Sequence, residues 1–227
     1  MNIASLIDHT LLKPTSRLGF VPLPVGEPLR ITWPTPNQQL WGVSEKFFAC
    51  TRVNSDFGKP GWTRDCGQRF HRGCDIAPVR VSATGQTTPV ILTDCATGQD
   101  FVSREPTWIP HDEVSNIFPG RIVEAVIDEA ISDFGRHVVI EHHWPKSGAI
   151  FFTLYGHLAE VWVVPGAVLT RAAVPLGKMG QTARSPDARN WLAIAPHLHF
   201  EVWDAAGAAY DPVEFLKEFL PVGPKIA

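Results

Sequence analysis

The sequence predicts an all-β domain with one short C-terminal helix. Segments rich in β-branched and aromatic residues, bounded by Gly or Pro, recur along the second half of the chain, whereas helical periodicity is scarce. The expected strands are residues 121–126, 137–141, 150–155, 161–164 and 197–203. The expected helix is 211–220, because Asp211 can cap it, Pro212 suits its first position and apolar residues follow at helical spacing.

The composition fits a globular protein with one core. Of the 227 residues 44% are hydrophobic, and 8 Trp and 13 Phe supply large side chains, although this length also permits two small domains. Residues 16–50 are rich in Pro and apolar residues, which favours short strands and an extended lead-in. We therefore expect residues 1–50 to form an N-terminal lead-in, packed on or preceding a main domain at 51–227.

Charge and hydropathy exclude several classes of partner. A net charge of −3, without a Lys/Arg run, argues against nucleic acid or an anionic membrane as the main partner. No apolar stretch approaches the ~18 residues needed to span a bilayer, and residues 1–9 lack the pattern of an export signal. The even number of cysteines favours an oxidising compartment slightly, but the sequence leaves the pairing open among Cys50, Cys66, Cys74 and Cys95.

A His-x-His pair near the C-terminus is the strongest chemical signal. On a strand, His197 and His199 would project from the same face, so both rings can enter one site. Upstream, His71 and Asp75 offer a nitrogen and a carboxylate four residues apart, and His157 stands alone in a Tyr-Gly-His-Leu segment. Two His and one Asp would leave a fourth position on zinc open for water, as a hydrolytic site requires.

The flanks and order of these motifs resemble the M23 family of zinc metalloendopeptidases, which are lysostaphin- and LytM-like. The resemblance rests on residues 71–78, 155–158 and 196–201, and it extends from about Ser55 onward through 55–58, 134–142, 177–182 and 210–212. It implies a mainly antiparallel β domain with an open groove and a Zn²⁺ ion held by His71, Asp75 and His199. It also implies that His157 and His197 transfer protons and stabilise the oxyanion, with the division between them left open.

The same resemblance implies a substrate and a location. The substrate would be the peptide stems or cross-bridges of bacterial peptidoglycan, cleaved by a monomer that is secreted, periplasmic, associated with the cell wall or released as a phage lysin. A rival interpretation is an inactive M23-like regulator of cell-wall amidases, although such regulators typically lose zinc ligands and all three are present here. A second rival is an aldolase, because residues 7–14 resemble the opening of deoxyribose-phosphate aldolases. No alternating βα pattern or Schiff-base lysine motif supports it.

Two long segments and several single residues lie near the motifs in the sequence. Residues 91–118 and 183–194 are longer than the family's usual connections, and Ala195 replaces a usual Gly. We expect both segments to border the groove, with the aromatic side chains of Trp108, Tyr155 and Trp191 as candidate groove residues. Cys74 should leave its strand on the face opposite Asp75, as a packed thiol or half of a disulfide. His137, His142 and His143 are expected to be polar residues at or beyond a strand end, not ligands.

Overall fold

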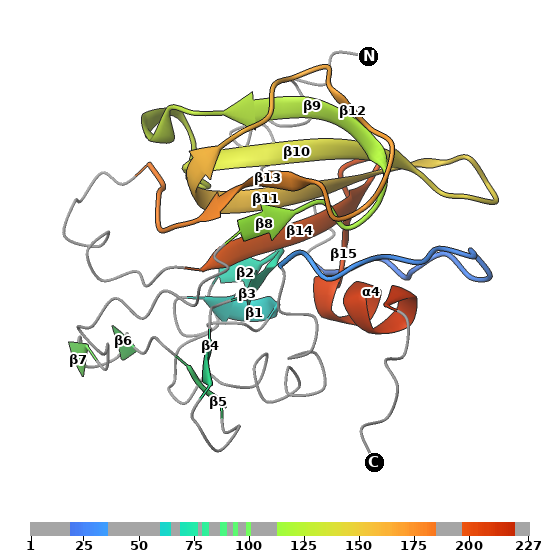
Figure 1. The fold of residues 1–227 in the computed structure, drawn as a ribbon. Helices are drawn as coiled ribbons and strands as arrows, with labels where there is room; N and C mark the ends of the chain where they lie inside the picture. Colours follow the sequence, from blue (N-terminus) through green and yellow to red (C-terminus); the bar gives the residue numbers. More distant parts are fainter. Residues whose placement is uncertain are drawn as a thin grey trace.

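The computed structural model describes residues 19–35, 60–64, 69–76, 113–184 and 197–220, and the backbone of four short strands between residues 79 and 100 (Figure 1). Within these residues the chain is mainly antiparallel β-sheet with one α-helix near its C-terminus. The all-β prediction with a short C-terminal helix is confirmed.

A nine-stranded sheet dominates the described residues. One path through it follows the order β12 (Val168–Leu169), β9 (Gly120–Val126), β10 (Arg136–His143), β11 (Ile150–Val161), β13 (Pro175–Met179) and β8 (Glu113–Ser115). The remaining three strands are β14 (Leu198–Asp204), which pairs with β11, and β15 (Ala209–Tyr210) and β3 (Cys74–Ile76), which both pair with β14. All of these pairings are antiparallel.

The sheet branches along β11. The first half of β11, from Phe151 to Gly156, pairs with β14, whereas Leu158 to Val161 pair with β13. Both partners lie on the side of β11 that faces away from β10, so they diverge at His157 (Figure 1). The candidate site lies at this branch, where an isolated bridge between Gly180 and His197 joins the residue after β13 to the residue before β14.

Short hairpins occupy the region before the main sheet. They are formed by β1 (Gly61–Arg64) with β2 (Arg69–His71), β4 (Val79–Val81) with β5 (Thr87–Pro89), and β6 (Thr93–Asp94) with β7 (Gln99–Asp100). The β1–β2 hairpin leads into β3, which is an edge partner of β14. This connection brings residues near position 70 next to residues near position 200.

The two faces of the main sheet bury different side chains. Along β14, Leu198, Phe200 and Val202 enter the large hydrophobic core, as alternation along a strand requires. His199, Glu201 and Trp203 point to the other face, where a smaller cluster contains Val139, Phe152, Leu154, Trp203 and Ala209. We call the first face the core face and the second the site face.

The helix and the lead-in both cover the core face. Helix α4 (Pro212–Phe219) begins at Asp211, whose carboxylate accepts hydrogen bonds from the backbone N–H groups of Val213 and Glu214. Its Phe215, Leu216 and Phe219 join the core, as do Leu29, Ile31 and Trp33 of the lead-in. The backbone N–H of Ile31 also donates to the Phe219 carbonyl, so the lead-in packs directly beside the helix.

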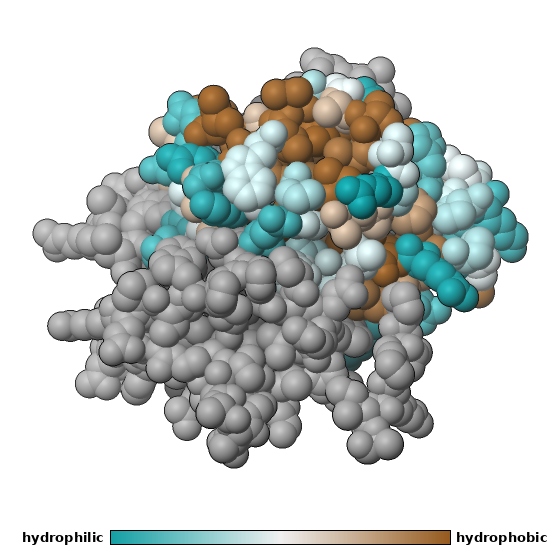
Figure 2. Space-filling view, viewed as in Figure 1, coloured by the Kyte–Doolittle hydropathy of each residue, from teal (hydrophilic) through white to brown (hydrophobic). Residues whose placement is uncertain are grey.

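Exposed apolar side chains gather over the connection that follows β11. Trp162, Val164 and Val168 are exposed there, and Figure 2 shows hydrophobic residues over this end of the sheet. Lys178 and Trp162 both donate hydrogen bonds to the Glu160 carboxylate beside this patch. Among the described residues, no helix combines the length and apolar character needed to cross a membrane.

The expected elements can be compared with the observed ones. The strands expected at 121–126, 137–141, 150–155 and 197–203 and the helix at 211–220 are confirmed as β9, β10, β11, β14 and α4. The separate strand expected at 161–164 is wrong, because β11 continues to Val161 and the chain then turns away. Within 19–35 no strand forms, and its β-pairing is limited to an isolated bridge between Val21 and Tyr210. The aldolase barrel is wrong for the described residues, which form an antiparallel sheet.

Candidate functional site

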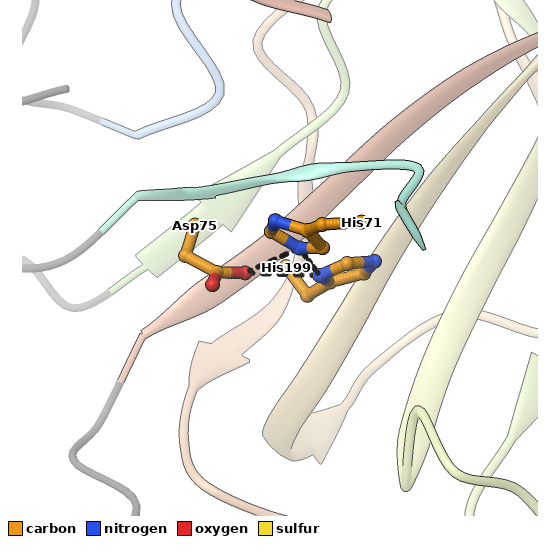
Figure 3. A group of neighbouring side chains, drawn as sticks. All are labelled: His71, Asp75 and His199. Atoms are coloured by element: carbon orange, nitrogen blue, oxygen red, sulfur yellow. Dashed lines mark hydrogen bonds and ion pairs between the residues drawn. The ribbon is translucent and has the colours of Figure 1, made fainter. Parts of the chain in front are cut away.

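Three side chains converge on the site face at the edge of β14 (Figure 3). His71 ends β2, Asp75 is the middle residue of β3, and His199 lies opposite Asp75 in the β3–β14 ladder. His71 Nε2 is 3.2 Å from His199 Nδ1 and 3.4 Å from Asp75 Oδ1, and His199 Nδ1 is 2.9 Å from the same oxygen. All three side chains are buried, so the cluster lies in the interior of the fold and is not a chance group of exposed polar residues.

The geometry and chemistry of this cluster fit a metal ion. Donor atoms around a tetrahedral zinc ion, at bond lengths of about 2.0–2.2 Å, lie about 3.3 Å apart. The three distances in the cluster lie close to this value. Two ring nitrogens and a carboxylate oxygen also direct electron pairs at a common point, which is favourable only when a proton or a cation lies among them. Among the described residues, this is the one group of three such donors.

Glu201 fixes the orientation of His199, and sequence reasoning gave it no role. Its Oε1 lies 2.9 Å from His199 Nε2, so that nitrogen carries the hydrogen and donates it to the carboxylate. The electron pair of Nδ1 is then directed at Asp75 and His71. Glu201 Oε2 in turn accepts a hydrogen bond from the Trp203 indole. Alternation along a strand could have identified Glu201, because residues 199, 201 and 203 share one face.

The charges around His199 attract a cation. Burial alone would lower the pKa of His199, but hydrogen bonds to Asp75 and Glu201 and the charges of these carboxylates raise it to about 9. Burial would likewise raise the pKa of Glu201, yet its contacts with His199, Arg72 and Trp203 lower it to about 2. A proton and a metal ion compete for the same electron pair on Nδ1. The site therefore stabilises positive charge at the point where the three donors meet.

His157 enters the site through an unusual backbone conformation. Regular alternation along β11 would place residue 157 on the core face, beside Tyr155. Its φ of 62° lies in the left-handed region, which a side chain other than Gly adopts at a cost of about 1–2 kcal/mol. The alternation shifts at this residue, so the His157 ring contacts the site face, with its centroid 4.7 Å from the ring of His197 and 5.6 Å from that of His199.

The hydrogen bond of His157 suits proton transfer. Its Nδ1 lies 2.6 Å from the Thr182 carbonyl oxygen, so Nδ1 carries the hydrogen and Nε2 keeps its electron pair. Burial, and then the neighbouring His197 and His199, lower the pKa of His157 well below its ordinary value. The ring is therefore neutral near neutral pH and can accept a proton.

His197 completes the site from the beginning of β14. Its backbone N–H donates to the Gly180 carbonyl in an isolated bridge, and its Nε2 lies 3.7 Å from Asp75 Oδ1. Because residues 197 and 199 share a face, the His-x-His pair reaches the same site, as the sequence predicted.

A turn between β9 and β10 supports both His157 and His199. The Phe134 carbonyl accepts a hydrogen bond from the His157 backbone N–H, and the Phe134 ring stacks on His199 at a centroid distance of 5.2 Å. Gly135 has a φ of 58°, and an added Cβ would collide with the backbone of Thr182, whose carbonyl binds His157. The turn thus positions both the His157 ring and the His199 ring.

Tyr155 and Cys74 both lie outside the site. Tyr155 is not a groove residue, because it is fully buried on the core face and its hydroxyl accepts a hydrogen bond from the Ile117 backbone N–H. Cys74 is a free, buried thiol opposite Phe200 in the ladder, so the prediction that it leaves the face of Asp75 is confirmed. The prediction that 91–118 and 183–194 border the groove falls mostly outside the described residues, as do its candidate side chains Trp108 and Trp191. The described end of the first segment, 113–118, forms β8 and places Ile117 in the large core. Cys50, Cys66 and Cys95 also lie outside the described residues.

The three remaining histidines of β10 lie away from the cluster. His142 is bound by the Pro119 carbonyl and the Thr153 hydroxyl, and His137 by the Gly135 carbonyl. His143 is exposed and lies 3.9 Å from Glu141. His143 ends the strand, and His137 and His142 are each one residue from an end, close to the expected positions. None of the three belongs to the group of donors described above.

An antiparallel sheet that gathers three buried metal donors and two further histidines defines a class of candidate metal-dependent hydrolases. The sequence model of peptidase family M23 matches residues 96–212, more than half of the chain. The chain belongs to this family. The match includes His157, His197 and His199 but begins after His71 and Asp75, which the fold itself brings to the site.

Solved structures of related proteins resemble parts of the chain. The antimicrobial peptidase lysostaphin from Staphylococcus simulans is 27% identical over 51% of this chain, with a TM-score of 0.37. This chain covers 44% of that lysostaphin chain, less than half of its length. The catalytic domain of the prophage-encoded M23 protein EnpA from Enterococcus faecalis is 14% identical, covers 90% of this chain and 98% of its own, and has a TM-score of 0.40. A zinc-containing peptidase from Vibrio cholerae is 19% identical over 85% of this chain and 38% of its own, with a TM-score of 0.38. A comparison with curated proteins gave no match.

Proposed function

We propose that the chain is a zinc-dependent endopeptidase that hydrolyses peptide bonds in the stems or cross-bridges of bacterial peptidoglycan. The observation that carries the proposal is the convergence of His71, Asp75 and His199 in distances suited to one metal ion, with His157 and His197 beside them. Membership of peptidase family M23 supports peptide hydrolysis. The substrate class follows from the sequence resemblance to lysostaphin- and LytM-like enzymes.

Each residue has a specific role in this proposal. His71, Asp75 and His199 would hold the ion through Nε2, Oδ1 and Nδ1. Zinc would supply Lewis acidity, polarising the scissile carbonyl and lowering the pKa of a water molecule toward ~7. His157, neutral and with Nε2 open, would take up a proton during attack. His197 would donate a hydrogen bond to the developing oxyanion.

The proposal also covers the setting in which the enzyme acts. A peptidoglycan substrate requires a periplasmic, secreted or wall-associated protein, or a phage lysin. The site lies where β11 changes its partner from β14 to β13, and an extended peptide would bind across the site face as a substrate of a monomer. The formal net charge is −3, so the chain has no excess of positive charge to attract nucleic acid.

The test combines metal analysis with digestion of purified sacculi. Wild-type protein should retain about one zinc per chain, release peptide fragments detectable by mass spectrometry, and lose this activity with a chelator. His157→Ala should retain zinc but lose at least about 100-fold in turnover, since a missing general base typically has this effect. His143→Ala is the matched control, because this exposed histidine lies outside the donor group, and it should retain both properties.

One outcome would replace the proposal with the regulatory alternative. In this outcome, zinc-loaded wild type cleaves no wall preparation or cross-bridge peptide, and wild type and His157→Ala stimulate a cell-wall amidase equally. The chain would then be an M23-like activator, and peptide hydrolysis would be rejected. Failure of wild type to bind zinc at all would reject the metal site.

A further inference from the structure

Two separate segments supply the metal donors, and their relative position determines whether the site exists. His71 and Asp75 come from the β2–β3 connection and β3, whereas His199 comes from β14. Among the described residues, three residue pairs join β3 to β14. A ladder this short leaves the connection between β2 and β3 in need of another attachment, because few hydrogen bonds fix it.

Arg72 makes that attachment from the position directly after His71. Its Nη2 donates a hydrogen bond of 2.9 Å to the Gly207 carbonyl in the turn between β14 and β15. Its guanidinium carbon lies 5.5 Å from the centre of the Trp203 ring, and its Nε lies 4.0 Å from Glu201 Oε2. One side chain therefore contacts the turn after β14 and two residues on the site face of β14.

The contact with Glu201 extends the effect of Arg72 to a metal donor. Glu201 receives the Nε2–H of His199 on one oxygen, and it faces the Trp203 indole and Arg72 with the other. A carboxylate constrained on both oxygens holds the imidazole in one orientation and one tautomer. If Arg72 is removed, Glu201 loses its cationic neighbour and one of the groups that fix it.

We propose that Arg72 is a positioning residue, which fixes the His71–Asp75 segment to β14 and, through Glu201, holds the His199 ring with Nδ1 directed at the metal. The inference rests on the proposed zinc site. Arginine suits the role because its planar guanidinium can stack on an indole and still donate hydrogen bonds in several directions. Lysine carries the same charge without this geometry, so it should replace Arg72 only in part.

The experiment measures zinc affinity by competition with a chelating dye in four proteins. These are wild type, Arg72→Met, Arg72→Lys and a matched control, Arg121→Met. Arg121 also forms an ion pair with a glutamate of the same sheet, through Nη2 at 3.0 Å from Glu141 Oε1, but it contacts no metal donor. We expect affinity to fall about 10- to 100-fold in Arg72→Met, as for other groups that orient metal ligands, and less in Arg72→Lys. Arg121→Met should match wild type.

A second measurement separates positioning from catalysis and from general stability. Arg72 does not belong to the residues proposed to act on the peptide, so excess zinc should restore turnover in Arg72→Met to within a few-fold of wild type. In ¹⁵N spectra of the zinc-bound protein, the hydrogen on His199 Nε2 should be well defined in wild type and lost or exchanging in the variant.

Each result either supports or rejects the role of Arg72. Zinc affinity of Arg72→Met within twofold of wild type would overturn the role of Arg72 and leave the zinc site standing. If Arg72→Met does not fold, Arg72→Lys decides in the same way. Weaker zinc binding with an intact circular dichroism spectrum supports the proposal, and unchanged binding rejects it. If wild type binds no zinc, the proposed function itself fails, and the role of Arg72 fails with it.

Discussion

Two buried imidazoles on opposite faces of one sheet show how the faces differ. His142, whose ring packs against Phe151 on the core face, and His199 on the site face are both almost completely removed from solvent. Burial lowers the pKa of His142 to about 4, although the Pro119 carbonyl acts in the opposite direction. At His199 the same burial is outweighed by Asp75 and Glu201, and the pKa rises to about 9.

The two pKa values differ because the two histidines have different hydrogen-bond partners, and not because they are buried to different extents. His142 has a carbonyl and a hydroxyl as neighbours, which satisfy a neutral ring completely. His199 lies between two carboxylates, which favour a cation. The core face thus contains a histidine whose neutral form stabilises the fold, whereas the site face contains a histidine whose neighbours favour a positive charge.

Removing the imidazole on the site face should abolish function. His199→Ala deletes one of three metal donors, and two remaining donors hold an ion poorly. We expect loss of stoichiometric zinc and a decrease in peptide cleavage of at least about 1,000-fold, measured by metal analysis and by release of fragments from sacculi. His142→Gln should retain zinc. Zinc retained in His199→Ala, or lost in His142→Gln, would contradict the division between the faces.

The imidazole on the core face should instead determine how stability depends on pH. Its folded pKa of about 4 is below the ordinary 6.5, so on acidification the unfolded chain takes up the proton first. The stability contributed by neutral His142 is therefore complete above about pH 6.5 and is lost as the pH falls toward 4. At about pH 4.5 the loss amounts to roughly 2–3 kcal/mol.

Urea unfolding of metal-free protein measures this effect. The difference in unfolding free energy between wild type and His142→Gln should shrink by this amount between about pH 7 and pH 4.5. His143→Gln, at the exposed neighbouring position, should show the pH dependence of wild type. A parallel pH dependence in wild type and His142→Gln would contradict the assignment of a neutral buried ring.

A pair of glycines tests the support of His157. Gly135→Ala and Gly148→Ala both place a side chain at a positive φ, 58° and 69° respectively. Only Gly135 has backbone atoms in the way, since an added Cβ would collide with Thr182, whereas no atom lies within 4 Å at Gly148. We expect Gly148→Ala to destabilise by about 1 kcal/mol and Gly135→Ala by about 2–3 kcal/mol.

The same pair should differ in activity. Gly135→Ala should reduce turnover because the Thr182 carbonyl must move away from His157 Nδ1. Gly148→Ala should leave turnover unchanged when both are measured on folded, zinc-loaded protein. Equal turnover in the two variants would show that the Thr182 contact is unimportant for catalysis.

The smallest effect is expected at an exposed ion pair between β11 and β13. Lys178 Nζ lies 3.1 Å from Glu160 Oε1, and both side chains are largely exposed. Lys178→Met should change the unfolding free energy by less than about 0.5 kcal/mol, because exposed ion pairs contribute little. Thermal unfolding at low and high salt provides the measurement. A loss above 1 kcal/mol would mean that the patch around Trp162 contributes more to stability than its exposure indicates.

Local patterns in the sequence predicted most of the fold, because the strands of the main sheet carry β-branched and aromatic residues and the helix carries its Asp-Pro start. The convergence of His71, Asp75 and His199 followed from the family motifs. Alternation along β14 contained the information to include Glu201, but Arg72 acts across the fold and has no local signal.

The wrong assignment of Tyr155 has a physical reason. Residues 155 and 157 should share a face on a regular strand, yet the left-handed conformation of His157 sends the two side chains to opposite faces. The change of partner along β11 from β14 to β13 was not predicted either, because long-range pairing determines it and no local pattern reports it. Sequence reasoning was therefore weakest at the residue where the backbone departs from a regular strand.

The left-handed backbone of His157 has an evolutionary consequence. Glycine and asparagine adopt this conformation more readily than histidine, so either replacement should relieve up to about 1 kcal/mol of backbone strain, although it removes the contact of the His157 ring with the Thr182 carbonyl. A population of variants selected only for resistance to unfolding would accumulate Gly or Asn at this position. Selection for peptide hydrolysis would retain His, if its ring takes up a proton as proposed. Residue 157 is thus a place where two selective pressures oppose each other, and a descendant that no longer cleaves peptides should lose this histidine early.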